Sequence, residues 1–206
     1  SDRVFDERTK NHLAVVVVLP RMSERTGPTR RQLLAGTATL FALAGCQSGT
    51  DAPEPVAIED GENCDQCGMV ISEHPGPVGE TYYRTNTPTG HDEPARFCST
   101  TCTYRHRFAK EQMDWTPAAT FLTDYSSVDY DVRTDGGATV LTHHLDASAF
   151  SETSELTVVA NSDVEGAMGT AIVPFGDSGD AEVFAEEYGG QTLPAEDIQR
   201  ELVSRG

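Results

Sequence analysis

Short apolar stretches separated by turns and polar loops make up most of the chain. The stretches between residues 80 and 122 predict strands and a helix in a definite order. Residues 80–85 and 95–97 are expected to be strands, because aromatic residues in short runs favour extended chain. Ser99 is a suitable N-cap for a helix that continues to about Gln112. Residues 121–122 indicate one more strand. The predicted order is therefore strand, strand, helix, strand.

The second half of the chain predicts the same order from pattern alone, without evident sequence similarity to the first half. Residues 180–188 carry apolar side chains at helical spacing, and two glycines follow that would end this helix. A final helix is expected from residue 195 to residue 204. The predicted strands of this half are residues 138–143, 156–160, 171–175 and 191–193.

These elements together predict an α+β fold with two small ββαβ units in tandem. We place the first unit at residues 61–125 and the second at residues 126–206. Residues 47–60 are polar and contain two prolines, so they are expected to form a flexible tether. Residues 1–46 are interpreted as an N-terminal extension with an export signal.

The export signal is predicted from adjacent arginines, Arg30 and Arg31, followed by a short apolar stretch at residues 33–45. Adjacent arginines indicate the twin-arginine route. The stretch ends in Leu-Ala-Gly-Cys, which resembles a lipobox. We therefore expect a lipid on Cys46 that anchors the body to the outer face of the cytoplasmic membrane; an uncleaved membrane anchor is the alternative. Residues 1–21 fit neither interpretation, and Met22 would be an ordinary first residue for such an export signal.

Charge excludes one class of function and indicates an environment. The 206 residues carry a net charge of −18, and residues 47–206 hold 8 basic against 29 acidic residues, a net charge of −21. A nucleic-acid-binding surface is basic, so no nucleic-acid partner is expected. The only lysine in this part is Lys110. Such a surface is typical of proteins from concentrated salt, where charge repulsion is screened; an ordinary acidic protein is the alternative.

Four cysteines carry the most informative chemistry: Cys64, Cys67, Cys98 and Cys102 lie within 39 residues. The first pair is spaced C-x2-C and the second C-x3-C, across the predicted start of a helix. Three interpretations are open. They are a thiol-exchange site, a closed four-thiolate zinc site, and a soft-metal site for Cu(I).

Met69 favours the copper interpretation, because thioether and thiolate together prefer Cu(I) over hard cations. Gly68 between Cys67 and Met69 would let both sulfur atoms turn to one side. Packing in the core is the alternative role for Met69.

Several motifs in order resemble the NosL family. The family pattern is matched by residues 62–71, 75–79, 97–100, 166–169 and 181–190, and the resemblance extends over residues 56–203. It implies two ββαβ units and a lipoprotein that binds Cu(I) and supplies copper to nitrous oxide reductase or its assembly machinery. Small metal-binding modules of the YHS and TRASH type share C-x2-C-G-M and F-C-S-x-x-C, and they are the alternative. Cys102 is a thiol beyond the family's F-C-S-T piece.

Other residues are secondary candidates. Met168, between small residues, is a possible second thioether ligand or a core residue, and His74 and His91 are possible nitrogen donors near the cysteines. His143 and His144 are adjacent, so in a strand they would face opposite sides. No motif of a hydrolase, a metalloprotease or a phosphate-binding loop occurs, so no enzyme is expected.

The sequence therefore predicts a non-enzymatic Cu(I) metallochaperone. A structural zinc module of the YHS/TRASH type and a thiol oxidoreductase are the alternatives. The predicted metal ligands are Cys64, Cys67, Met69, Cys98, Cys102 and Met168.

Overall fold

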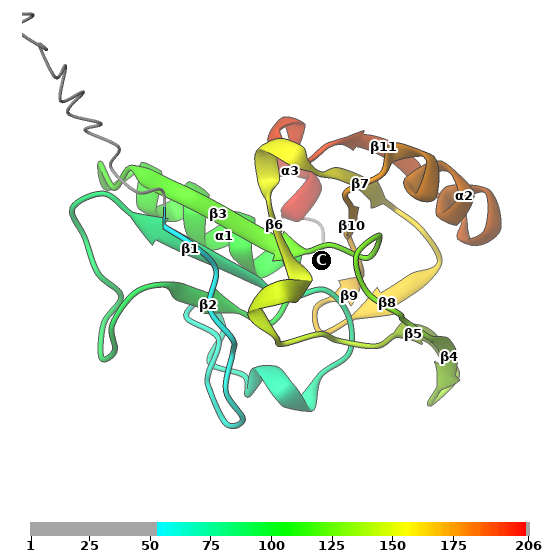
Figure 1. Cartoon of the computed structure of the whole chain (residues 1–206), viewed down its shortest axis with the longest axis horizontal. Helices are drawn as coiled ribbons and strands as arrows, with labels where there is room; N and C mark the ends of the chain where they lie inside the picture. Colours follow the sequence, from blue (N-terminus) through cyan, green and yellow to red (C-terminus); the bar gives the residue numbers. More distant parts are fainter. Residues whose placement is uncertain (1–52, 205–206) are drawn as a thin grey trace, which may run out of the picture. The chain divides into compact units, whose positions relative to one another are not determined.

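The computed structural model describes residues 53–204, so the predicted export signal, Cys46 and residues 47–52 of the predicted tether lie outside the described residues. The described part is α+β, as predicted (Figure 1). Its helices are α1 (Thr100–Glu111), α2 (Ser178–Tyr188) and α3 (Arg200–Val203). Its strands are β1 (Gly79–Tyr83), β2 (Ala95–Phe97), β3 (Pro117–Thr123), β4 (Val132–Asp135), β5 (Ala138–Leu141), β6 (Phe150–Glu152), β7 (Thr157–Ala160), β8 (Val164–Gly166), β9 (Gly169–Thr170), β10 (Val173–Phe175) and β11 (Gln191–Pro194). Short 3-10 turns are η1 (Ile71–Glu73), η2 (Ala147–Ala149), η3 (Thr153–Glu155) and η4 (Ala195–Asp197).

The strands form three sheets with the orders β2-β1-β3-β6, β10-β7-β11 and β4-β5-β8-β9. The first two sheets are antiparallel throughout, and the third contains one parallel pair, β5 with β8. The order strand, strand, helix, strand occurs as β1-β2-α1-β3 and again as β7-β10-α2-β11. In the first half β1 pairs with both β2 and β3, and in the second half β7 pairs with both β10 and β11. The division into separate units at residue 125 stays a prediction.

Helix α1 packs on one face of the first sheet. The approach is close at Gly79, where an added Cβ would clash with Thr103 Oγ1 of α1. The chain before η1 crosses the opposite face, because Tyr82 Oη donates to the carbonyl of Glu54 (2.9 Å) and the Val56 N–H donates to Glu80 Oε2 (3.1 Å). The first sheet is therefore covered on both faces.

A shared apolar cluster links the two halves of the chain. It joins Tyr104 of α1 and Leu122 of β3 to Val158 of β7, Ile198 and Val203. The phenol of Tyr104 donates to the carbonyl of Ala195 (2.6 Å). Helix and sheet of the first half thus share a core with the C-terminal segment.

The predicted uninterrupted helix over residues 195–204 is wrong. The structure has η4, then extended chain at Ile198, then the short α3. The Ala195 carbonyl accepts from Tyr104 Oη and from the Ile198 N–H, so it does not accept from Gln199 as an α-helix would require. Strands β4, β6, β8 and β9 were not predicted, because each has two to four residues and a largely polar or exposed pattern.

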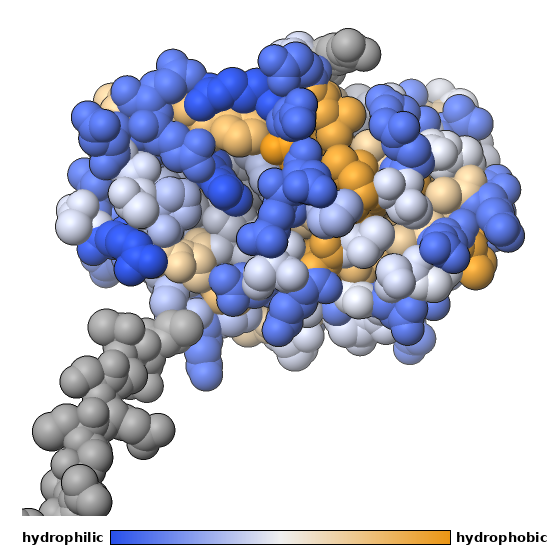
Figure 2. All heavy atoms as spheres, turned by 90° about the horizontal axis from the view of Figure 1, so that it is seen from above, coloured by the Kyte–Doolittle hydropathy of each residue, from blue (hydrophilic) through white to orange (hydrophobic). Residues whose placement is uncertain are grey.

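The surface is strongly hydrophilic: Figure 2 shows hydrophilic side chains over most of one face, with apolar residues visible between them. Within residues 53–204, no helix has the length and apolar character needed to cross a bilayer.

One carboxyl group is fully enclosed in the first sheet. Glu80 in β1 is 0% exposed, and its Oε1 has no hydrogen-bond partner among residues 53–204. Burial raises its pKa to about 7, with a contribution from Glu62, while Arg96 and the Val56 N–H act in the opposite direction. The folded protein therefore holds a proton on Glu80 that the unfolded chain loses near pH 4.5.

Glu80→Gln should remove a pH dependence of folding. In the wild type, the stability that this group contributes is complete below about pH 4.5 and is lost as the pH rises through about 7, because the folded state retains the proton. The shift corresponds to roughly 3 kcal/mol at most. The variant cannot ionise, so it should be more stable than wild type above pH 7 by about 1–3 kcal/mol. Thermal unfolding from pH 5 to pH 8 measures this, with the exposed Glu201→Gln as the matched control; parallel curves for all three proteins would contradict it.

Candidate metal centre

The sulfur atoms of Cys64, Cys67, Cys98 and Cys102 all lie within 4.8 Å of one another. The Sγ atoms of Cys67 and Cys98 are 3.5 Å apart, and those of Cys98 and Cys102 are 3.8 Å apart. All four are free thiols. Cys64, Cys98 and Cys102 are at most 2% exposed, whereas Cys67 is exposed. Three sulfurs are therefore enclosed and one faces solvent.

A tight turn presents the first two cysteines. The Cys64 N–H donates to the carbonyl of Met69 and the Gly68 N–H donates to the carbonyl of Cys64, both at 2.8 Å. Gly68 has φ +77°, a conformation that glycine adopts without the cost of a Cβ. A bridge between Asn63 and Val70 closes the base of the turn. The backbone thus fixes both Cys64 and Cys67 on one side of the turn.

The start of α1 presents the other two cysteines. Cys98 directly follows β2, and Ser99 is the N-cap whose Oγ accepts the Cys102 N–H (3.0 Å). Cys102 lies in the first helical turn, one turn beyond Cys98, so both side chains lie on the same face. The predicted N-cap is confirmed, and it is the feature that aligns this pair.

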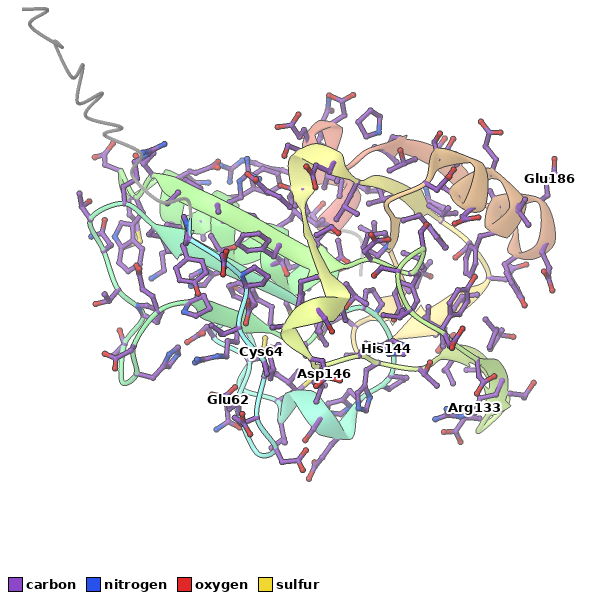
Figure 3. The ribbon with its side chains drawn as sticks, viewed as in Figure 1. Glu62, Cys64, Arg133, His144, Asp146 and Glu186 are labelled. Atoms are coloured by element: carbon purple, nitrogen blue, oxygen red, sulfur yellow. The ribbon has the colours of Figure 1, made fainter. Side chains whose placement is uncertain are left out.

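The turn and the helix start are held together by a pair of residues that sequence reasoning missed. The Asp65 N–H donates to the Arg96 carbonyl (2.9 Å), and the Arg96 N–H donates to Asp65 Oδ2 (2.8 Å). Arg96 also forms an ion pair with Glu62 (Nε–Oε2, 3.2 Å). Figure 3 shows Glu62 close to Cys64. Because Asp65 adjoins Cys64 and Arg96 lies two residues before Cys98, this pairing sets the distance between the two cysteine pairs.

His91, a predicted nitrogen donor, is occupied elsewhere. Its Nε2 lies 3.0 Å from Asp65 Oδ1, and its Nδ1 lies 2.6 Å from the carbonyl of Asp92. Burial lowers the pKa of His91, but the hydrogen bonds to Asp65 and to the Asp92 carbonyl, together with the charge of Asp65, outweigh burial and leave the pKa above its ordinary value. His91 therefore supports the turn through Asp65.

The other methionines and histidines considered from the sequence make separate contacts. Met69 is half-buried, and its carbonyl closes the cysteine turn. Met168 packs against the apolar cluster that contains Cys64, Cys98 and Cys102. His74 accepts a hydrogen bond from His143 through its backbone carbonyl (3.0 Å), and His144 stacks edge-on against Tyr125.

The cluster favours a negative charge on Cys64. Hydrogen bonds from the thiols of Cys102 and Cys98 lower the pKa of Cys64, and backbone groups of Cys98 and Cys67 lower it further against the effect of burial. The Cys102 and Cys64 thiols, with burial, raise the pKa of Cys98. The contact with Cys64, with burial, raises the pKa of Cys102, while Cys98 acts in the opposite direction. Two neighbouring thiols thus favour the thiolate form of Cys64.

The donor set suits a soft or borderline metal ion. In a tetrahedral four-thiolate zinc site, bonds of about 2.3 Å place neighbouring sulfurs about 3.8 Å apart, which resembles the sulfur spacing here. Thiolate ligands are also those preferred by Cu(I), and a lower coordination number needs only two or three of them. The four thiols could therefore hold a metal ion at the junction of a turn, a strand end and a helix start.

Comparisons with known proteins place a chain with this fold and this thiol cluster in a family. The sequence model of the NosL family matches residues 55–203. The chain is 30% identical over 166 residues to the copper-binding lipoprotein NosL of Stutzerimonas stutzeri, covering 79% of this chain and 77% of that protein. It also resembles the crystal structure of the copper chaperone NosL from Shewanella denitrificans, with a TM-score of 0.54 and 29% identity over 72% of this chain and 98% of that one.

The chain belongs to the NosL family. The resemblance inferred from the sequence motifs is therefore confirmed. The two relatives are named for copper binding and chaperone activity, neither of which is a catalytic role.

Proposed function

We propose that the protein is a Cu(I) metallochaperone that supplies copper to nitrous oxide reductase or to its assembly machinery. The observation that carries the proposal is the cluster of four free thiols with sulfurs within 4.8 Å of one another. The names of the two NosL relatives support copper as the cargo.

The unequal exposure of the sulfurs supports a role in transfer. Cys64 would hold Cu(I) from the buried side as the preformed thiolate, with Cys98 and Cys102 lending further sulfur ligands. Cys67 is exposed, so an incoming ligand of an acceptor protein would replace it first. Met69 and Met168 would approach as thioether ligands that keep exchange fast, because a thioether binds Cu(I) more weakly than a thiolate does.

The tether and Cys46 would keep this centre outside the cell. We propose that Cys46 is lipidated and holds the domain at the outer face of the cytoplasmic membrane, in agreement with the lipoprotein name of one relative. Membrane fractionation tests this anchor, since Cys46→Ala should move to the soluble fraction.

Zinc is the second candidate metal, because sulfur spacings of 3.5 and 3.8 Å resemble those of a tetrahedral four-thiolate zinc site. A structural zinc module would retain Zn(II) and would release nothing to a copper enzyme. The thiol oxidoreductase alternative has less support, since the C-x2-C pair lies in a turn before a strand and its Cys64 is buried.

A transfer experiment tests the function. Chain loaded with one equivalent of Cu(I) and freed of excess metal is mixed with copper-depleted nitrous oxide reductase under reducing conditions. We expect copper to appear in nitrous oxide reductase and its activity to recover. The chain loaded with Zn(II) should neither deliver copper nor restore activity. Retention of all copper by the chain, together with failure of Cu(I) to displace bound Zn(II), would favour the zinc module instead.

A further inference from the structure

A second candidate site lies in the other half of the chain, beside α2. It is a pocket of about 240 Å³ between the segment after β3, the end of β10 and one face of α2. None of the four clustered cysteines lines it, and Figure 3 shows α2, labelled at Glu186, well separated from Cys64, so this pocket is distinct from the metal centre. Neither the family resemblance nor the copper chemistry accounts for it.

Aromatic rings make up most of its wall. Tyr125 lies 5.1 Å from Tyr130 and 6.2 Å from Phe175, and Phe184 lies 5.2 Å from Phe175 and 4.7 Å from Tyr188, all between ring centroids. Tyr125, Phe175 and Phe184 are at most 2% exposed. They form a rigid floor, while Tyr130 and Tyr188 are half-buried at the rim. Each ring face carries partial negative charge.

Carboxylates complete the rim. Asp180 and Glu187 line the pocket from the same face of α2, about two turns apart along the helix. Burial raises the pKa of Tyr130, and the charges of Asp180 and Glu187 raise it further. Helix α2 carries four acidic residues and no basic one, and neither Asp180 nor Glu187 forms an ion pair with another residue in the range 53–204. No lysine or arginine lines the pocket.

We propose that this pocket binds the guanidinium group of an arginine side chain presented by a partner protein. A guanidinium is planar and weakly hydrated, so it stacks on aromatic faces while its N–H groups reach carboxylates at the edge. An ammonium is more strongly hydrated and lacks the flat faces, which makes lysine the poorer fit. Free arginine would make only the contacts inside the pocket, whereas an arginine within a polypeptide would bring neighbouring residues over the exposed surface beside it. The occupant is therefore an arginine within a polypeptide.

The exposed side chain of Val183 supports a protein partner. Val183 lines the same pocket and is 62% exposed, one of two large apolar side chains among residues 53–204 that are so exposed. A polypeptide that inserted an arginine would cover it and bury apolar area. The acidic surface around the pocket would attract a basic partner over the same face.

The test uses the metal-free full chain, so that it does not depend on copper binding. Acetyl-Gly-Arg-Gly-amide is titrated into the isotope-labelled protein and followed by nuclear magnetic resonance. One cation–π contact with carboxylate hydrogen bonds predicts a Kd of about 1–10 mM. We expect saturable shifts in residues 125–130 and 178–188, at least about 5-fold weaker binding of the lysine peptide, and no saturation with the glutamine peptide.

Variants place the binding in the pocket. Asp180→Asn and Tyr130→Leu should each weaken the arginine peptide by about 5-fold or more, whereas Glu155→Gln, an exposed carboxylate elsewhere, should leave the affinity unchanged. Asp180 is exposed, so its variant keeps the fold even if Tyr130→Leu does not. Equal shifts with the glutamine peptide, or unchanged affinity in Asp180→Asn, would overturn the proposal.

Discussion

Cys64→Ser should lower the affinity of the protein for Cu(I) by at least about 100-fold. Loss of groups that only orient a ligand already costs 10- to 100-fold in metal affinity, and Cys64 is expected to be a ligand itself. It is also the residue on which the hydrogen bonds of Cys98 and Cys102 converge to stabilise a thiolate. A serine hydroxyl at this position is a hard, protonated donor that Cu(I) does not favour.

Competition with a Cu(I)-specific chromophore under reducing conditions measures this loss. Cys46→Ser is the matched control, because it makes the same substitution at a cysteine outside the four-thiol cluster, and its affinity should equal that of the wild type. Circular dichroism verifies that Cys64→Ser is folded. Wild-type affinity in folded Cys64→Ser would refute the assignment of the centre.

The melting temperature should rise by roughly 10 °C between 0.1 and 2 M KCl, which corresponds to about 3–5 kcal/mol for a protein of this size. Residues 47–206 carry a net charge of −21, and the screening length falls from about 10 Å at 0.1 M salt to about 3 Å at 1 M. The repulsion has identifiable sources. Glu182 and Glu186 of α2 are exposed like charges at spacing i, i+4, an arrangement that destabilises a helix.

Glu186→Lys is the variant that separates charge screening from other effects of salt. It places a lysine four residues after Glu182, which converts repulsion into attraction. It should raise the melting temperature at 0.1 M KCl by more than at 2 M KCl. Sucrose at matched osmolarity, which stabilises without screening charge, should not reproduce the difference. Equal melting temperatures in low and high salt would contradict the proposed adaptation to concentrated salt.

Local signals in the sequence were sufficient for much of the fold. The helix after Ser99 was predicted because a capping residue precedes a long run without breakers, and α2 because Ala181 and Phe184 recur at helical spacing. The prediction of an uninterrupted C-terminal helix was wrong, because the interruption depends on the phenol of Tyr104, which donates to the carbonyl of Ala195, 91 residues away in sequence. Such a long-range hydrogen bond leaves no trace in the local pattern.

The candidate site shows the same division between local and distant information. Spacing and clustering of the four cysteines indicated a common site, since both pairs lie in short motifs. The pairing of Asp65 with Arg96 and the enclosure of Glu80 were not predictable, because each depends on which strand lies beside which. The aromatic pocket was missed for the same reason: its rings come from the segment after β3, from β10 and from α2.

The most direct test of the central proposal is X-ray absorption at the copper edge of the full chain loaded with one equivalent of Cu(I). The cluster predicts an edge typical of Cu(I) and a first coordination shell that contains sulfur alone, contributed by two or three ligands. Cys98→Ser/Cys102→Ser should lose part of that sulfur shell, whereas Cys46→Ser should keep it intact. A first shell of nitrogen or oxygen in the wild type, or an identical sulfur shell in a chain that lacks Cys64, would contradict the assignment of copper to this thiolate centre.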